Sequence, residues 1–375
     1  MKYIELVSNG VFDPRAKTEL VFYHENCADG SCSAGLHAAM KKARYAEQAL
    51  SGRGVPTSTI YCPVKYGNET ETANIVKEAI SEHRIREISE LWILDFHFES
   101  ELLKDIFRQL GCPNKVVYFD HHKTAKEELE KFRQWIVLNY YLTHIDAGFG
   151  GSAEAGAGMT YDYIVNRLNY GSEESAFAAG NDSGYKHIKE LVDTCVDYDL
   201  WTHNNPDTMG IITGIMAAPL PVSKWADMLL DYSSVRNSYL DRGLGIIDQQ
   251  KYIAQQLAES GQFPELEYGG CRIAMLNIPH QWVNIVSHEL LERSDFDAVL
   301  SYSVAGRDEY VNVSMRAGKN RGLDCGEFMK KWFSGGGHAA AAGGRCAGIA
   351  EYLRQIENIK DLVRSEDKTC PEVSR

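Results

Sequence analysis

Carboxylate and imidazole side chains gather in four short motifs within the first 201 residues of this chain. Asp120-His121-His122 and Asp95-Phe96-His97 each follow an apolar run, and the other two motifs are His24–Asp29 and Val196–Trp201. Carboxylate oxygens and imidazole nitrogens are the ligands that a catalytic pair of divalent cations needs. Manganese or magnesium suits this mixture better than structural zinc, because no set of thiolates accompanies it. The residue types therefore indicate a metal centre.

Each motif alone also has a simpler interpretation. Asp29 and Asp95 each precede a predicted helix, where an aspartate serves as an N-cap. Asp197 lies near a helix end, where acidic residues are often only solvated, and Asp193 and Asp199 are rival candidates for its role. Four such sets in one predicted domain favour a metal centre over four separate structural explanations.

A fifth motif, Gly335-Gly336-Gly337-His338-Ala339-Ala340-Ala341-Ala342-Gly343, is suited to binding an anion. The three glycines leave backbone N–H groups open to an anion, and the small residues after them would let a helix begin close to it. Residues 316–345 contain six basic residues, Arg316 among them, against two acidic ones, a local charge of +4 in a chain of net charge −13. We therefore expect a negatively charged partner to bind there. A flexible glycine-rich turn with a stray histidine is the alternative.

The elements that must position the first motifs alternate between strands and helices. Apolar runs predict strands over 19–24, 58–62, 91–95 and 116–120, and helical spacing predicts helices over 30–42, around 73–83 and over 102–110. This alternation implies right-handed crossovers and a parallel sheet, and ligands bind at the carboxyl edge of such a sheet. Since His24, Asp95 and Asp120 all end strands, we expect that edge to gather them.

The remainder of the chain predicts a helical stretch and a second domain. Residues 125–229 are mainly helical, broken by Gly148–Ser152, and an amphipathic helix over 239–257 is stopped at Gly261–Pro264. Beyond it, strands are expected over 272–276, 298–304 and 310–315, and helices over 281–292 and 349–363. The predicted fold is therefore two-domain α/β, with a parallel-sheet metal-binding domain over residues 1–232, a linker helix over 233–263, a smaller substrate-binding domain over 264–366 and a disordered tail over 367–375.

Composition narrows the class of protein. With 44% apolar and 24% charged residues, no signal sequence and no membrane-spanning run, the 375-residue chain is typical of a cytosolic protein. Its nine cysteines contain no Cys-x-x-Cys pair, which indicates reduced thiols and not a disulfide framework or a zinc knuckle. The net charge of −13 repels long nucleic acid and favours a small phosphorylated substrate or a short oligonucleotide.

In chain order, the motifs resemble those of the DHH phosphoesterase superfamily, in the branch with a DHH-associated C-terminal domain. The resemblance extends from residue 24 to 343, through His24-x-x-Cys27-x-Asp29-Gly30, Leu94-Asp95, Asp120-His121-His122, Asp197 and Gly335–Gly343. It implies a metal-dependent phosphodiesterase in which a water between two metals, manganese by preference, attacks phosphorus. Magnesium or another divalent ion is the alternative cofactor.

The resemblance also implies a role for each site residue. One metal would be held by His24, Asp95 and position 27, and the other by Asp29, Asp95, His121 and Asp197, so that Asp95 bridges them. Asp120 and His122 would orient ligands or the phosphate, and substrate would be bound across an interdomain cleft by Arg316, Gly335, Gly336, Gly337 and His338.

Position 27 departs from the pattern, because Cys27 stands where many relatives have aspartate. A thiol is a poorer manganese ligand than a carboxylate. Cys27 therefore weakens the first metal site, shifts it toward a softer ion, or is simply a small buried residue.

The expected substrates are short oligonucleotides or linear dinucleotides, such as 5′-phosphorylated pGpG, cleaved to mononucleotides. The alternatives are a RecJ-like single-strand exonuclease, a nucleoside bisphosphate phosphatase or pyrophosphatase and, outside enzymes, a degenerate DHH scaffold that has lost its ligands. The sequence indicates no membrane and no protein partner. It leaves open the base preference, the choice between RNA and DNA, the metal and the oligomeric state, a homodimer included.

Overall fold

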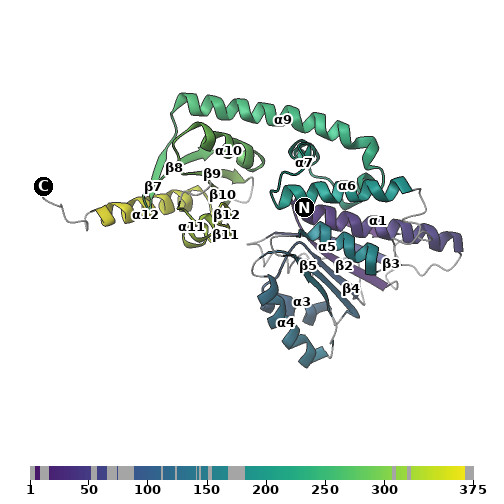
Figure 1. Ribbon diagram of the computed structural model, residues 1–375. Helices are drawn as coiled ribbons and strands as arrows, with labels where there is room; N and C mark the ends of the chain where they lie inside the picture. Colours follow the sequence, from purple (N-terminus) through teal and green to yellow (C-terminus); the bar gives the residue numbers. More distant parts are fainter. Residues whose placement is uncertain are drawn as a thin grey trace, which may run out of the picture. The chain divides into compact units, whose positions relative to one another are not determined.

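The computed structural model divides the chain into two compact units, residues 1–244 and 245–375 (Figure 1). It describes residues 5–8, 17–51, 57–65, 74, 88–110, 113–122, 125–140, 142, 145–150, 154–167, 182–305, 310–318 and 322–367. Each unit has its own sheet and its own buried apolar clusters. Across these ranges, no helix combines the length and the hydropathy that crossing a membrane requires.

The first unit is built on a six-stranded sheet in which five neighbouring strands are parallel. The strand order is β1-β3-β2-β4-β5-β6, with bounds β1 Glu5–Ser8, β2 Lys17–His24, β3 Thr57–Val64, β4 Ile88–Leu94, β5 Lys115–Asp120 and β6 Asp146–Phe149. The four strands predicted from apolar runs are confirmed as β2 to β5, in the parallel arrangement expected. The prediction misses β1 and β6, because each is only four residues long and Gly148 in β6 indicated a break.

Helices cover both faces of this sheet. Along β2, Val21 packs in one apolar cluster with α1, α5, α6, α7 and α8, whereas Leu20 and Phe22 pack in another with α3 and α4. This division follows from the alternation of side chains along a strand. The helices are α1 Ala28–Ser51, α3 Ser100–Leu110, α4 Ala125–Tyr140, α5 Gly156–Asp162 with the π-helix Tyr163–Arg167, α6 Asp182–Asp199, α7 Thr208–Met216 and α8 Val222–Leu230. The helix predicted around 73–83 lies outside the described residues, apart from Asn74.

The second unit contains a mixed sheet of order β11-β12-β10-β9-β8-β7, in which only β8 and β9 are parallel among the described pairs. Its elements are β7 Glu265–Tyr268, β8 Cys271–Asn277, the 3-10 helix His280–Trp282, α10 Val283–Arg293, β9 Ala298–Ala305, β10 Tyr310–Ala317, α11 Cys325–Trp332, β11 Gly336–His338, β12 Ala341–Cys346 and α12 Ile349–Asp367. The strands and helices predicted here are confirmed as β8, β9, β10, α10 and α12.

One prediction for the second unit is wrong. No helix begins after the three glycines; instead, β11 and β12 form a hairpin that pairs Gly336 with Gly343 and His338 with Ala341. The backbone approach explains this difference, since a Cβ on Gly335 would lie 2.0 Å from the carbonyl oxygen of Gly343. Here the glycines allow two strands to pack closely. The amino-acid composition of the segment alone does not distinguish this use of glycine from the start of a helix.

The long helix predicted over 239–257 is confirmed as α9, which extends from Tyr232 to Ser260. The division between the two units falls inside α9, after Leu244. The domain bounds at residues 232 and 264 remain a prediction. Of the tail predicted over 367–375, only Asp367 belongs to the described residues.

Glycines let α7 and α9 touch backbone to backbone. A Cβ on Gly214 would lie 1.9 Å from the carbonyl oxygen of Tyr239, and a Cβ on Gly243 would lie 1.7 Å from that of Gly210. Backbone atoms inside two packed helices cannot rotate away as a flexible side chain can. The packing of α7 against the first turns of α9 therefore depends on these glycines.

We expect Gly243→Ala to lower the free energy of unfolding by about 1–3 kcal/mol, the usual effect of overpacking. Gly245→Ala, two residues later in α9, is the control, because nothing lies within 4 Å of its Cβ. That alanine should raise stability by up to about 1 kcal/mol through helix propensity alone. Urea denaturation of both variants measures the contrast, and equal effects would contradict the close helix approach.

Candidate metal centre

The carboxyl ends of three parallel strands bring the predicted motifs together in the first unit. β2 ends on His24, β4 ends immediately before Asp95, and β5 ends on Asp120. Four overlapping groups of potential ligands result, each with its ligand atoms within 4.8 Å of one another: His24, Cys27 and Asp95; Asp95, His121 and His122; His97, Asp120 and His122; and Asp29, His121 and Asp199. The expectation that one sheet edge gathers these side chains is thus fulfilled within the first unit.

Asp95 lies at the centre of these groups and is 1% exposed. Its Oδ2 lies 3.4 Å from His24 Nδ1 and its Oδ1 lies 3.4 Å from His121 Nε2, and neither contact meets hydrogen-bond geometry. Burial raises the pKa of Asp95, but the contacts with His121 and His24 outweigh it and hold the pKa well below its usual range. An ionised carboxylate buried in this way is costly unless cations neutralise it. Both of its oxygens are therefore suited to metal binding.

The backbone at Asp95 is strained to present this carboxylate. Its φ of 53° lies in the left-handed region, which non-glycine residues adopt rarely and mostly at functional sites. Gly156 lies directly against it: a Cβ there would be 2.8 Å from Asp95 Cβ and 2.9 Å from Asp29 Oδ2. A side chain at position 156 would therefore displace two of the proposed ligands.

Asp29 does act as a cap, but for a helix distant in sequence. It sits in the first turn of α1, is fully buried, and accepts hydrogen bonds from the N–H groups of Gly156 (2.6 Å) and Ala157 (2.7 Å) at the start of α5. Burial, followed by the charges of Asp95 and Asp199, raises the pKa of Asp29 well above its usual value. Capping and metal binding are compatible, because each carboxylate oxygen has a second lone pair.

Asp120 orients the histidines around it. Its Oδ1 accepts from the backbone N–H groups of His121 (2.8 Å) and His122 (3.1 Å) and lies 2.5 Å from His122 Nδ1, while its Oδ2 lies 3.3 Å from His97 Nδ1. Burial alone would lower the pKa of His122, but the bond to Asp120 raises it to about 9. These contacts agree with supporting roles for Asp120 and His122. The sequence motif contained His97 but gave it no role, and the structure makes it a partner of Asp120.

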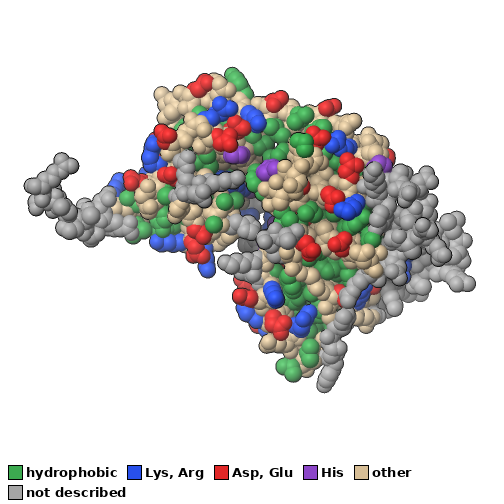
Figure 2. Space-filling view, viewed as in Figure 1, with side chains coloured by type: hydrophobic (Ala, Val, Ile, Leu, Met, Phe, Trp, Pro, Cys, Tyr) green, Lys and Arg blue, Asp and Glu red, His purple; other side chains and the backbone are tan. Residues whose placement is uncertain are grey.

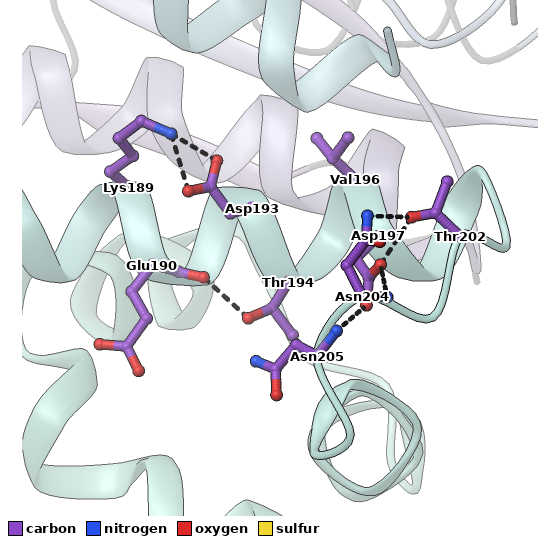
Figure 3. A pocket seen from close by; sticks show the side chains of 9 residues that line it. All are labelled: Lys189, Glu190, Asp193, Thr194, Val196, Asp197, Thr202, Asn204 and Asn205. Atoms are coloured by element: carbon purple, nitrogen blue, oxygen red, sulfur yellow. Dashed lines mark hydrogen bonds and ion pairs between the residues drawn. The ribbon is translucent and has the colours of Figure 1, made fainter. Parts of the chain in front are cut away.

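Asp199, and not Asp197, joins the cluster. Asp199 Oδ2 lies 3.2 Å from His121 Nε2, and burial together with the charge of Asp95 raises its pKa to about 6. The carboxylate of Asp197 instead accepts hydrogen bonds from Thr202, Asn204 and Asn205 (Figure 3). It also accepts one from Thr208. Asp193 is exposed and pairs with Lys189 (2.6 Å). Two residues are about 200° apart around a helix, so one helix cannot direct both aspartates of this Asp-x-Asp to the same site.

Helical periodicity could have identified Asp199 from the sequence. It lies four residues after Cys195 and seven after Val192, both of which are buried on the face of α6 that packs against α1 and α5. Motif resemblance cannot make this distinction, because both aspartates belong to the same short motif. Another face of α6 borders a hollow of about 600 Å³, whose lining includes Asp197 but no member of the four ligand groups. Figure 3 shows the side chains that line it.

Cys27 lies with His24 and Asp95, the place expected of a ligand. Burial, followed by the charges of Asp95, Asp199 and Asp29, raises the pKa of its thiol well above the usual value. The thiol is thus neutral among the carboxylates, and only a bound cation would favour the thiolate.

In the second unit, Arg316 and the glycine-rich hairpin come together on neighbouring strands, with Arg316 in β10 opposite Ala341 in β12. Arg316 donates to Asn284 Oδ1 through Nε (2.9 Å) and Nη2 (2.7 Å) and to the carbonyl oxygen of Met315 (2.8 Å). Sequence reasoning missed Asn284, which fixes the guanidinium from α10. Two basic residues counted in the +4 segment, Lys319 and Arg321, lie outside the described residues.

We expect Asp199→Asn to weaken Mn²⁺ binding at least about tenfold, because it removes a ligand charge next to His121. Asp193→Asn removes the same charge from the same helix at an exposed position and should leave the affinity unchanged. Calorimetric titration of the metal-free protein with Mn²⁺ compares the two. A loss of affinity in Asp197→Asn but not in Asp199→Asn would restore the sequence-based choice of ligand.

Comparison with known proteins matches part of this chain to a family model and most of it to a viral protein. The family model of the DHHA1 domain matches residues 273–366. An uncharacterised protein of Acanthamoeba polyphaga mimivirus is 24% identical over 358 residues, which are 94% of this chain and 73% of the viral protein.

Two solved structures align with nearly the whole chain. An exopolyphosphatase-related protein from Bacteroides fragilis aligns over 93% of this chain and 94% of its own, with 13% identity and a TM-score of 0.47. The pGpG-specific phosphodiesterase PggH of Vibrio cholerae aligns over 93% of this chain and 99% of its own, with 12% identity and a TM-score of 0.43.

The family match covers the second unit, and the DHH-type motifs meet at one edge of the sheet in the first. Residues 273–366 thus form a DHHA1 domain, and the motifs gathered in the first unit resemble those of the DHH phosphoesterase superfamily.

Proposed function

We propose that this chain is a phosphodiesterase that uses two divalent cations to hydrolyse short oligonucleotides or linear dinucleotides, such as pGpG, to mononucleotides. The observation that carries the proposal is the buried Asp95 carboxylate, whose two oxygens face His24 and His121 without hydrogen bonds. This arrangement supports a carboxylate that bridges two cations. Manganese is our preferred metal, since oxygen and nitrogen donors dominate the set.

The proposed ligands follow the geometry of the first unit. His24, Cys27 and Asp95 would hold one cation, and Asp29, Asp95, His121 and Asp199 the other. Such cations lower the pKa of water and neutralise charge on phosphoryl oxygens. Asp120 holds His122 and His97 in place, and the raised pKa of His122 supports a cationic imidazole available to the phosphate.

The DHH-associated unit supports a role in substrate binding. Asn284 and the carbonyl oxygen of Met315 hold the Arg316 guanidinium in one orientation, and a fixed guanidinium loses little freedom when it binds a phosphate. The β11–β12 hairpin places Gly336 and Gly337 beside the strand pair that carries Arg316. We propose that Arg316, Gly335, Gly336, Gly337 and His338 contact the substrate's phosphate or nucleoside.

The cell compartment is also part of the proposal. Seven cysteines fall among the described residues as free thiols, at positions 27, 32, 62, 195, 271, 325 and 346. Free thiols are usual where the environment is reducing. They support the prediction of a cytosolic enzyme.

The length of the substrate is the first thing to measure. With Mn²⁺ and low salt, we expect a 5′-phosphorylated dinucleotide to be hydrolysed faster, by kcat/KM, than a 20-nucleotide single strand of the same bases, because a net charge of −13 disfavours a long polyanion. A panel of lengths from two to twenty, repeated at two salt concentrations, provides the measurement. Faster hydrolysis of the long strand, with steep salt sensitivity, would favour the RecJ-like alternative.

We expect Asp95→Asn to reduce kcat at least about 1,000-fold while the protein remains folded. Asparagine preserves the size of the side chain and tolerates the left-handed φ of 53°, so the variant removes only the charge. Circular dichroism and the melting temperature report folding beside the kinetics, and Asp193→Asn is the surface control. Unchanged turnover in Asp95→Asn would remove the two-metal mechanism and leave the scaffold alternative.

A further inference from the structure

The turn after α6 holds an indole at the protein surface beside the proposed metal ligands. Trp201 comes two residues after Asp199 and is 42% exposed. Its ring meets His203 edge to face at 4.6 Å and Tyr198 at 5.9 Å. Tryptophan gains more from burial than almost any other side chain, so an exposed one next to a reactive centre needs a reason.

The backbone of this turn is strained to keep the indole there. Trp201 and His203 both have a φ of 55°, the left-handed region that bulky residues rarely adopt. Strain of this kind persists only where the surrounding structure enforces it, and it concentrates at ligand sites. Two strained residues in one turn raise the free energy of the folded state. A turn that only linked α6 to α7 would have no need of that strain.

Asp197 enforces this conformation. Asp197 is 7% exposed, and its carboxylate accepts from Thr202 Oγ1 (2.6 Å), Asn204 N (2.7 Å) and Asn205 N (3.3 Å) (Figure 3). It also accepts from Thr208 Oγ1 (2.5 Å). All four donors belong to the turn or to the first residue of α7. One buried carboxylate therefore fixes the segment that carries Trp201 and His203.

The position of the indole selects its ligand. The Cα atoms of Asp199 and Trp201 are two residues apart and so lie at most about 7 Å from each other. Trp201 is therefore within a nucleotide's length of a phosphate bound by a cation at Asp199. A flat nucleobase of any identity stacks on an indole, whereas a phosphate has no flat face to stack. An exposed aromatic face beside a phosphate-binding centre thus fits a nucleoside phosphate better than pyrophosphate or polyphosphate.

We infer that Trp201, with His203 against its edge, is a stacking platform for a nucleobase of the substrate, and that Asp197 is the residue that positions it. The inference rests on the proposed phosphodiesterase function and names the part of the substrate that the first unit recognises. It also gives the Asp-x-Asp motif two separate tasks, metal binding by Asp199 and base binding through Asp197.

The test compares two substrates that differ only in their bases. One is pGpG, and the other is the same 5′-phosphorylated dinucleotide backbone with abasic sugars. For pGpG, Trp201→Ala should raise KM about tenfold with kcat within about threefold, and Trp201→Phe should recover most of the loss. For the abasic substrate, wild type and Trp201→Ala should have the same KM. Tyr252→Ala, which removes another exposed aromatic ring, is the control.

Asp197→Asn tests the positioning role. Since its amide NH₂ would face the donors of the turn, we expect a rise in KM for pGpG similar to that of Trp201→Ala, with no change for the abasic substrate. A general loss of structure would instead impair both substrates.

The outcomes separate the two proposals. If Trp201→Ala leaves the KM for pGpG unchanged, or raises it equally for the abasic substrate, the stacking platform is wrong while the phosphodiesterase proposal stands. If wild type hydrolyses neither dinucleotide with Mn²⁺, the phosphodiesterase proposal fails, and the base platform fails with it.

Discussion

A buried carboxylate without hydrogen bonds determines how the first unit is built. Asp95 is almost fully buried, its pKa is held well below the usual range, and the imidazoles of His24 and His121 lie 3.4 Å from its two oxygens. The parallel sheet supplies this arrangement, because β2 and β5 flank β4 and their carboxyl ends deliver one histidine to each side. The left-handed backbone at Asp95 and the absence of a side chain at Gly156 follow from the same requirement.

Crowding of like charges explains why the same edge is suited to cations. Asp29, Asp95 and Asp199 converge, and burial with mutual repulsion raises the pKa of Asp29 and that of Asp199. A protein selected for stability alone would replace such a group with apolar residues. Two cations would neutralise it and restore favourable charge pairing. Burying like charges together in this way costs stability, as expected where function and stability compete.

The sequence predicts the parts of this protein that rest on local pattern. Long apolar runs predict β2 to β5, and strand ends predict the gathering of His24, Asp95 and Asp120. Short or glycine-containing strands such as β1, β6 and the β11–β12 hairpin are not predicted. Their pairing with neighbouring strands, and not their own composition, stabilises them. Contacts between segments that are distant in sequence are not predicted either. Asp29 caps α5 from 127 residues away, and Asn284 holds Arg316 across 32 residues.

Asp197 and Asp199 show where motif reasoning ends and geometry begins. Both aspartates belong to one motif, and resemblance assigns the motif a single role. Alternate residues of a helix point about 200° apart, so the carboxylates of Asp197 and Asp199 face different surroundings. One meets His121 in the ligand cluster, and the other meets hydroxyl and backbone donors in the next turn. A short acidic motif at a helix end can therefore direct one carboxylate into a cluster of potential metal ligands while the other shapes the adjoining loop.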